Sequence, residues 1–135
     1  MRQPVCIPIA CRSAMIQHAM QELPNECCGI LIGRNERIER AQALRNIEPS
    51  PDTYRMDPEE QVALFRAMEQ RGEQLLGIYH SHPHGPPEPS ALDLRLAFHP
   101  HVVYVIVSLE DPHCPQVRGF FLSQNSFAEV SLIFV

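Results

Sequence analysis

The sequence predicts an α/β fold with a mixed central sheet flanked by helices. Short apolar runs rich in β-branched residues, typical of central strands, occur between segments whose apolar residues recur at helical spacing. At 135 residues, with 44% hydrophobic and 20% charged residues, the chain can bury one proper core but hardly two. We therefore expect residues 1–135 to form a single domain.

The first half of the chain is expected to form a strand, a helix and then a pair of strands. Residues 5–9 start a strand, and residues 13–23 form a helix. The apolar positions at helical spacing in that helix are Met15, Ile16, Ala19, Met20 and Leu23. Residues 28–32 form a buried strand, and residues 38–47 form its antiparallel neighbour after a polar turn.

The second half opens with a clear helix start. Asp57 precedes Pro58, and Glu60 follows three places after the aspartate. The positions expected on the buried side of this helix are Val62, Phe65 and Met68. The helix is expected to end near residue 71, before a glycine.

The remaining elements complete the sheet. Residues 75–80 and 102–107 are short apolar runs rich in β-branched residues, so we predict two central strands. Between them a short helix is expected to begin at Ser90. Two weaker strands follow, over residues 117–122 and 127–135.

The charge balance disfavours several classes of partner. The formal net charge of −5 and a pI near 5.8 give no basic surface for nucleic acid or for an anionic membrane. The chain also lacks an apolar run of about 18 residues, the length that a spanning helix needs. We expect a cytoplasmic protein that binds neither nucleic acid nor membranes.

The cysteines agree with a reducing compartment. They are odd in number and contain no Cys-x-x-Cys pair: Cys6, Cys11, Cys27, Cys28 and Cys114. Neither a disulfide framework nor a thiolate zinc site fits this spacing. Cys27 and Cys28 are expected to be small buried hydrophobes on opposite sides of a strand, with a nucleophilic cysteine as the less favoured alternative.

The most informative motif is His80-Ser81-His82, with Asp93 eleven residues after the second histidine. Side chains at i and i+2 of a strand point the same way, so both imidazoles could bind one ion. A catalytic zinc takes three protein ligands and keeps a fourth position for water. A proline-rich loop leads away from the strand, and the helix after it would bring Asp93 back as the third ligand.

Two simpler explanations compete with a zinc site. Ser90 and Asp93 have the spacing of a helix capping box, in which serine and acid satisfy free backbone amides. The paired histidines, taken alone, could be core or surface residues. The aspartate at this distance from the histidines favours the metal site.

Glu26 is the candidate general base. It lies at the start of the apolar, glycine-bounded strand after residue 27. A glutamate beside a water molecule activated by a metal can take its proton and later deliver that proton to a leaving amine. The alternative is that Glu26 is a solvated surface charge.

These residues together resemble the JAMM (MPN+) metalloprotease family, in particular its short prokaryotic members. The matching motifs are Glu26-x-Cys28-Gly29, His80-Ser81-His82-Pro83 and Ser90-x-x-Asp93. The resemblance implies a JAMM/MPN architecture of the cytidine-deaminase-like kind and one Zn²⁺ per chain, bound by His80, His82 and Asp93. It also implies that Glu26 is the general acid and base, and that Ser90 helps to stabilise the tetrahedral oxyanion.

The resemblance implies a substrate as well. Members cleave peptide or isopeptide bonds after the C-terminal Gly-Gly of ubiquitin or of ubiquitin-like sulfur carriers, and the short members are similar to the latter group. We therefore expect tail processing of a sulfur carrier, or release of an amino acid such as cysteine from it. A catalytically inactive MPN scaffold and a deubiquitinase-like isopeptidase are the alternatives, and a homodimer stays open.

Overall fold

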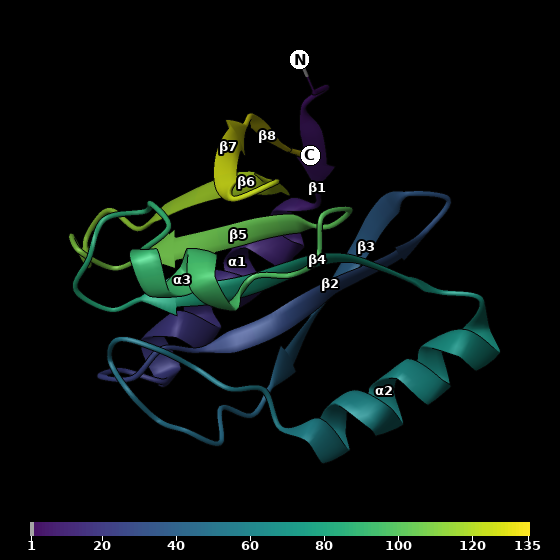
Figure 1. Ribbon diagram of the computed structural model, residues 1–135, viewed down its shortest axis with the longest axis horizontal. Helices are drawn as coiled ribbons and strands as arrows, with labels where there is room; N and C mark the ends of the chain where they lie inside the picture. Colours follow the sequence, from purple (N-terminus) through teal and green to yellow (C-terminus); the bar gives the residue numbers. More distant parts are fainter. Residues whose placement is uncertain (1) are drawn as a thin grey trace.

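The computed structural model describes residues 2–135 and contains a six-stranded sheet with the strand order β3-β2-β4-β5-β6-β7 (Figure 1). Its strands are β2 (Cys28–Arg34), β3 (Arg37–Leu44), β4 (Gln74–His82), β5 (Val103–Ser108), β6 (Gln116–Ser123) and β7 (Ser126–Val130). β4 and β5 are parallel, and all other neighbours in this sheet are antiparallel. The predicted mixed sheet is therefore confirmed.

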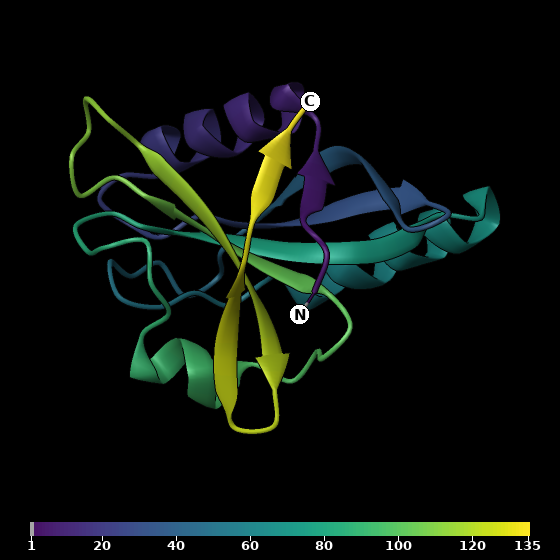
Figure 2. The same ribbon diagram turned by 90° about the horizontal axis from the view of Figure 1, so that it is seen from above.

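Helices cover both faces of the sheet. α1 (Ile9–Gln21) lies on one face and α3 (Ala91–Leu96) on the other, as Figure 2 shows from above. Cys27 packs in the core under α1, whereas Cys28 packs in the opposite core, to which α2 (Pro58–Arg71) contributes Met68. Both cysteines are fully buried, as expected for small hydrophobes. Within residues 2–135, no helix is long and apolar enough to cross a membrane.

The two chain ends form a second, small sheet. β1 (Val5–Ile7) pairs in parallel with β8 (Leu132–Phe134). The prediction of one strand over residues 127–135 is wrong, because the chain leaves the large sheet after Val130 and pairs again only beyond Ser131. A run of strand-forming residues does not specify which neighbouring strand each segment of the run will pair with.

α1 begins four residues earlier than predicted and is rotated from the expected face. Pro8 at the N-cap ends β1 and starts the helix directly. Cys11, Met15 and Ala19 are buried at a spacing of four, whereas Met20 is 43% exposed and Leu23 44% exposed. The prediction that Met20 and Leu23 belong to the buried face is therefore wrong.

α2 has the predicted ends but not the predicted buried side. The Asp57 carboxylate accepts a hydrogen bond from the Glu59 amide, and Gly72 ends the helix with φ of 66°. Met68 is buried, yet Val62 is 51% exposed and Phe65 38% exposed. Apolar residues occur on almost every side of this helix, so their spacing in the sequence did not define a single buried face.

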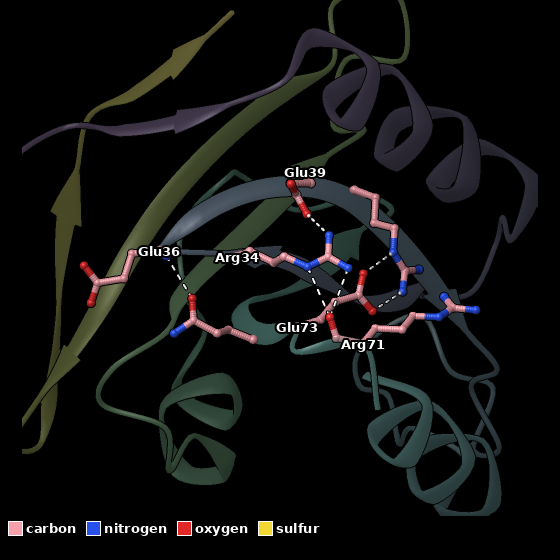
Figure 3. Close-up of polar contacts among 7 residues, drawn as sticks. Arg34, Glu36, Glu39, Arg71 and Glu73 are labelled. Carbon is pink, nitrogen blue, oxygen red and sulfur yellow. Dashed lines mark hydrogen bonds and ion pairs between the residues drawn. The ribbon is translucent and has the colours of Figure 1, made fainter. Parts of the chain in front are cut away.

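Polar contacts fasten the carboxyl end of α2 to the sheet (Figure 3). Arg34 at the end of β2 donates from Nε and Nη2 to the Arg71 carbonyl oxygen, at 3.2 and 3.1 Å. Glu73 pairs with Arg40 of β3 at 3.1 Å. These contacts lie at the start of β4, and the two histidines lie at its other end.

Candidate metal centre and active site

β4 delivers both histidines of the motif. His80 and His82 lie on one face of the strand, within its last three residues, and they are 2% and 8% exposed. β2 and β5 flank this end of β4, with His80 opposite Cys28 and His82 opposite Ser108. The imidazoles are therefore held at the end of a central strand that is paired on both sides.

α3 delivers Asp93 to the same point. The Ser90 hydroxyl accepts from the Asp93 amide at 3.0 Å, and the Ser90 amide donates to Asp93 Oδ2 at 2.9 Å. This capping box is present together with the metal-site geometry, so the two explanations of the motif are not exclusive. The cap fixes the start of α3 and aims the carboxylate toward the histidines.

The three side chains converge on one point. His80 Nε2 and His82 Nε2 are 3.2 Å apart, and Asp93 oxygens lie 3.2 Å from the first and 2.9 Å from the second. A tetrahedral ion with bonds of about 2.0–2.1 Å separates its ligand atoms by about 3.3 Å. The group could therefore hold a metal ion with little rearrangement.

The charges of the group reflect this convergence. Burial alone would raise the pKa of Asp93, but hydrogen bonds from His80 and His82 outweigh it and hold the pKa well below its usual range. Burial lowers the pKa of His82, but the Asp93 hydrogen bond reverses this and leaves it raised. An ionised carboxylate beside two ring nitrogens is a donor set that suits a divalent transition-metal ion.

Different contacts orient the two rings. His82 Nδ1 lies 2.8 Å from the Pro86 carbonyl oxygen, which leaves Nε2 for a metal. Ser108 fastens the same loop by donating to the Gly85 carbonyl oxygen at 2.6 Å. His80 Nδ1 is buried with no hydrogen-bond partner within residues 2–135, and the Tyr54 ring stacks on this imidazole instead.

The positions of Tyr54, Ser108 and the Pro86 carbonyl around the histidines were not predicted from the sequence. Ser108 stands at the end of a predicted strand and Tyr54 in a polar loop, and nothing in their local pattern marks them. Only the packing of that loop and of β5 beside β4 brings them to the histidines.

Glu26 is buried beside the metal group, which contradicts its reading as a solvated charge. It is 2% exposed, and its Oε1 finds no partner in the described part of the chain. Burial raises the pKa of Glu26 from 4.5 to about 8, and the charges of Asp93 and Asp52 act in the same direction. Such a carboxyl can accept or donate a proton near neutral pH.

The backbone around Glu26 is tied to β4. The Ser81 hydroxyl accepts from the Cys27 amide at 2.8 Å, and Asn46 donates to the Glu26 carbonyl oxygen at 3.0 Å. Ser81, the middle residue of the His-x-His motif, therefore fixes the backbone next to Glu26 relative to the histidines. The Cys27 and Cys28 thiols are poor nucleophiles, because burial raises the pKa of each to about 12.

Two cavities reach the metal group. The larger, of about 490 Å³, is lined by His80 and Asp93 and is walled mainly by apolar side chains. The smaller, of about 280 Å³, is lined by Glu26, His82 and Ser90. Ser90 is exposed in it, and because its oxygen accepts from Asp93, its hydroxyl proton is left to donate.

The mixed sheet brings together two histidines from one strand and an aspartate from an adjacent capped helix, a group that could hold a metal ion, with a buried glutamate beside it. The chain belongs to the family of prokaryotic homologs of the JAB domain, whose model matches residues 8–120. The resemblance noted from the motifs is confirmed.

Proteins of known name are similar over most of this chain. The CysO-cysteine peptidase of Mycobacterium tuberculosis is 40% identical over 119 residues, 87% of this chain and 82% of that protein. A probable TtuB-protein conjugate cleaving protease of Thermus thermophilus is 40% identical over 86% of this chain and 73% of its own length. The desampylase of Haloferax volcanii is 36% identical over 72% of this chain and 75% of its own.

Solved structures agree with the fold. Protein DSY2949 from Desulfitobacterium hafniense superposes with a TM-score of 0.88 at 38% identity, covering 97% of this chain and 92% of that one. AF2198, a JAB1/MPN domain protein from Archaeoglobus fulgidus, gives a TM-score of 0.57 at 17% identity, covering 97% and 99%. The expected JAMM/MPN architecture is therefore confirmed.

Proposed function

We propose that this protein is a zinc-dependent peptidase that hydrolyses the bond after the C-terminal Gly-Gly of a ubiquitin-like sulfur carrier. The observation that carries the proposal is the buried Glu26 carboxyl, whose Oε1 has no partner among residues 2–135, next to a convergent His-His-Asp group. Relatives named for CysO-cysteine and for TtuB-protein conjugates support this class of substrate.

The proposed mechanism gives each residue one task. His80, His82 and Asp93 would hold the zinc ion, which supplies Lewis acidity and activates a water molecule when bound. Glu26 would accept a proton from the attacking water and deliver it to the leaving amine. Ser90 donates a hydrogen bond to the oxyanion that develops on the scissile carbonyl. The hydroxyl of water ends on the glycine carboxyl, and its proton ends on the amine.

A catalytically inactive scaffold is the competing function. A scaffold gains nothing from a buried carboxyl without a partner, because desolvating such a group costs free energy that no contact returns. A catalytic base needs that arrangement, since its proton must be exchanged with substrate. The isopeptidase alternative uses the same residues and differs only in the leaving group.

The direct test is cleavage of a ubiquitin-like carrier that ends in Gly-Gly and is extended by a short peptide. Zinc-loaded wild type is expected to release the peptide, and zinc-loaded Glu26→Gln to lose nearly all turnover while keeping its metal. Ser90→Ala is expected to lose about 10²–10³-fold in kcat. Equal turnover by wild type and Glu26→Gln would contradict the proposed role of Glu26.

Three further expectations belong to this proposal. We place the reaction in the cytoplasm, since all five cysteines are unpaired and two of them are exposed. We treat residues 1–135 as one catalytic domain. A homodimer stays a prediction, which the mass of the purified protein in solution would check.

A further inference from the structure

The two cavities approach the metal group from different sides. His80 and Asp93 line the larger, whereas Glu26, His82 and Ser90 line the smaller. The scissile carbonyl must lie at the metal group, so the two halves of the substrate extend into different cavities. The positions of the catalytic groups decide which half enters which.

Proton transfer sets the direction. Glu26 must come within about 2.6–3.2 Å of the leaving nitrogen to protonate it. Glu26 lines the smaller cavity and not the larger, so we place the leaving group in the smaller one. The carrier tail then lies in the larger cavity, whose walls are mainly apolar and include Tyr54, Met56, Leu96, Phe98, Tyr104 and Phe127.

The leaving-group side carries negative charge. Two exposed carboxylates, Asp52 and Glu88, line the smaller cavity, together with the candidate ligand His82 and the exposed His84. No arginine is among the lining residues of the described chain, and the sequence contains no lysine. Arg118 lies 3.9 Å from Glu88, but it also lies 3.8 Å from Glu129 and does not line the cavity.

We propose that this smaller cavity is a leaving-group subsite in which Asp52 and Glu88 disfavour a free carboxylate next to the scissile nitrogen. The inference rests on the proposed function and refines its substrate. An amino acid joined to the carrier through its α-amine brings a carboxylate into this subsite, where Asp52 and Glu88 repel it and neither arginine nor lysine is in place to bind it; the exposed His84 is the one lining side chain, besides the candidate ligand His82, that could donate to it. A lysine side chain joined through Nζ brings none, and basic residues around that lysine are attracted. The subsite therefore favours protein conjugates over single amino-acid adducts.

The test uses one carrier protein with three adducts at its terminal glycine: cysteine with a free carboxylate, cysteine amide, and the Nζ of a lysine in a basic peptide. The first two differ only in charge. Zinc-loaded wild type is expected to cleave the amide with about tenfold higher kcat/KM than the free acid, and the lysine conjugate at least as well as the amide. The preference is expected to shrink at high salt, because the charges are near the surface.

Variants that remove two negative charges distinguish an effect of the subsite from an effect of the protein's net charge. Asp52→Asn with Glu88→Gln is expected to reduce the amide-to-acid ratio to about threefold or less. Glu36→Gln with Glu69→Gln removes the same two charges outside this subsite and is expected to keep the wild-type ratio. A wild-type ratio near one, or faster cleavage of the free acid, would overturn the inference and leave the proposed function standing. No cleavage of any adduct would overturn both.

Discussion

The Tyr54 ring stacks on the His80 imidazole, with centroids 4.9 Å apart and planes inclined by 28°. His82 has its second ring nitrogen fixed by the Pro86 carbonyl oxygen, but His80 Nδ1 is buried without a partner in residues 2–135. The Tyr54 ring therefore packs on the face of His80, whose Nδ1 lacks the acceptor that orients most metal-binding histidines.

Replacing this aromatic face is expected to weaken metal binding. Tyr54→Leu removes the stack, and we expect the zinc affinity, measured by competition with a chelating dye, to fall about tenfold or more. Tyr54→Phe keeps the ring and is expected to bind zinc within about twofold of wild type. Unchanged affinity in Tyr54→Leu would show that β4 alone orients His80.

Glu26 is expected to make the metal-free protein less stable as pH rises. The unfolded chain loses this proton near pH 4.5, whereas the folded chain keeps it to about pH 8. Between these values the folded state binds more protons than the unfolded state, so the free energy of unfolding falls with increasing pH and levels off above about 8.

Glu26→Gln isolates this effect, because the amide has no proton to lose. In chelator-treated protein, the variant's free energy of unfolding minus that of wild type is expected to grow from pH 4.5 to 8. Urea titrations across this range measure the difference, in which other titrating groups cancel. A difference that stays constant with pH would mean that Glu26 is not buried in solution.

Gly29 is required by the packing of β2 on β4. A Cβ at this position would run into the Tyr79 ring and the Gln42 carbonyl oxygen. Gly29→Ala is therefore expected to lower the free energy of unfolding by about 1–3 kcal/mol. Gly85→Ala is the control, since its Cβ would meet nothing closer than His82 Cβ at 3.8 Å. Equal melting temperatures for the two variants would contradict this packing.

The orientation of α2 can be tested by truncating its apolar residues. Met68→Ala is expected to cost about 2 kcal/mol or more, because this side chain is 4% exposed. Val62→Ala is expected to change stability by less than about 0.5 kcal/mol, since Val62 is 51% exposed. A larger loss of stability in Val62→Ala would indicate that Val62 lies on the buried side of α2, as the sequence pattern predicted.

Local sequence signals located most of the elements. The aspartate-proline start and glycine end of α2 were predicted correctly, because capping depends on a few adjacent residues. The buried face of α2 and the division between β7 and β8 were not, because each depends on a distant partner. After Ser131 the chain pairs with β1, which lies at the other end of the sequence.

The candidate site could likewise be predicted only where it depends on local sequence. The spacing of His80, His82 and Asp93 led to residues that the structure brings together, because strand alternation and helix capping are local. The burial of Glu26 and the stacking of Tyr54 depend on loops that meet only in the folded chain. The acidic lining contributed by Asp52 and Glu88 likewise has no signature in sequence.

The most direct test of the account is the metal content of purified wild type and of Asp93→Ala, with Ser90→Ala as the control. Ser90→Ala loses the helix cap but keeps all three ligands, so it separates loss of a ligand from loss of the α3 start. We predict about one zinc per chain in wild type and in Ser90→Ala, and little in folded Asp93→Ala. Folded wild type that takes up no zinc when zinc is supplied would contradict the account.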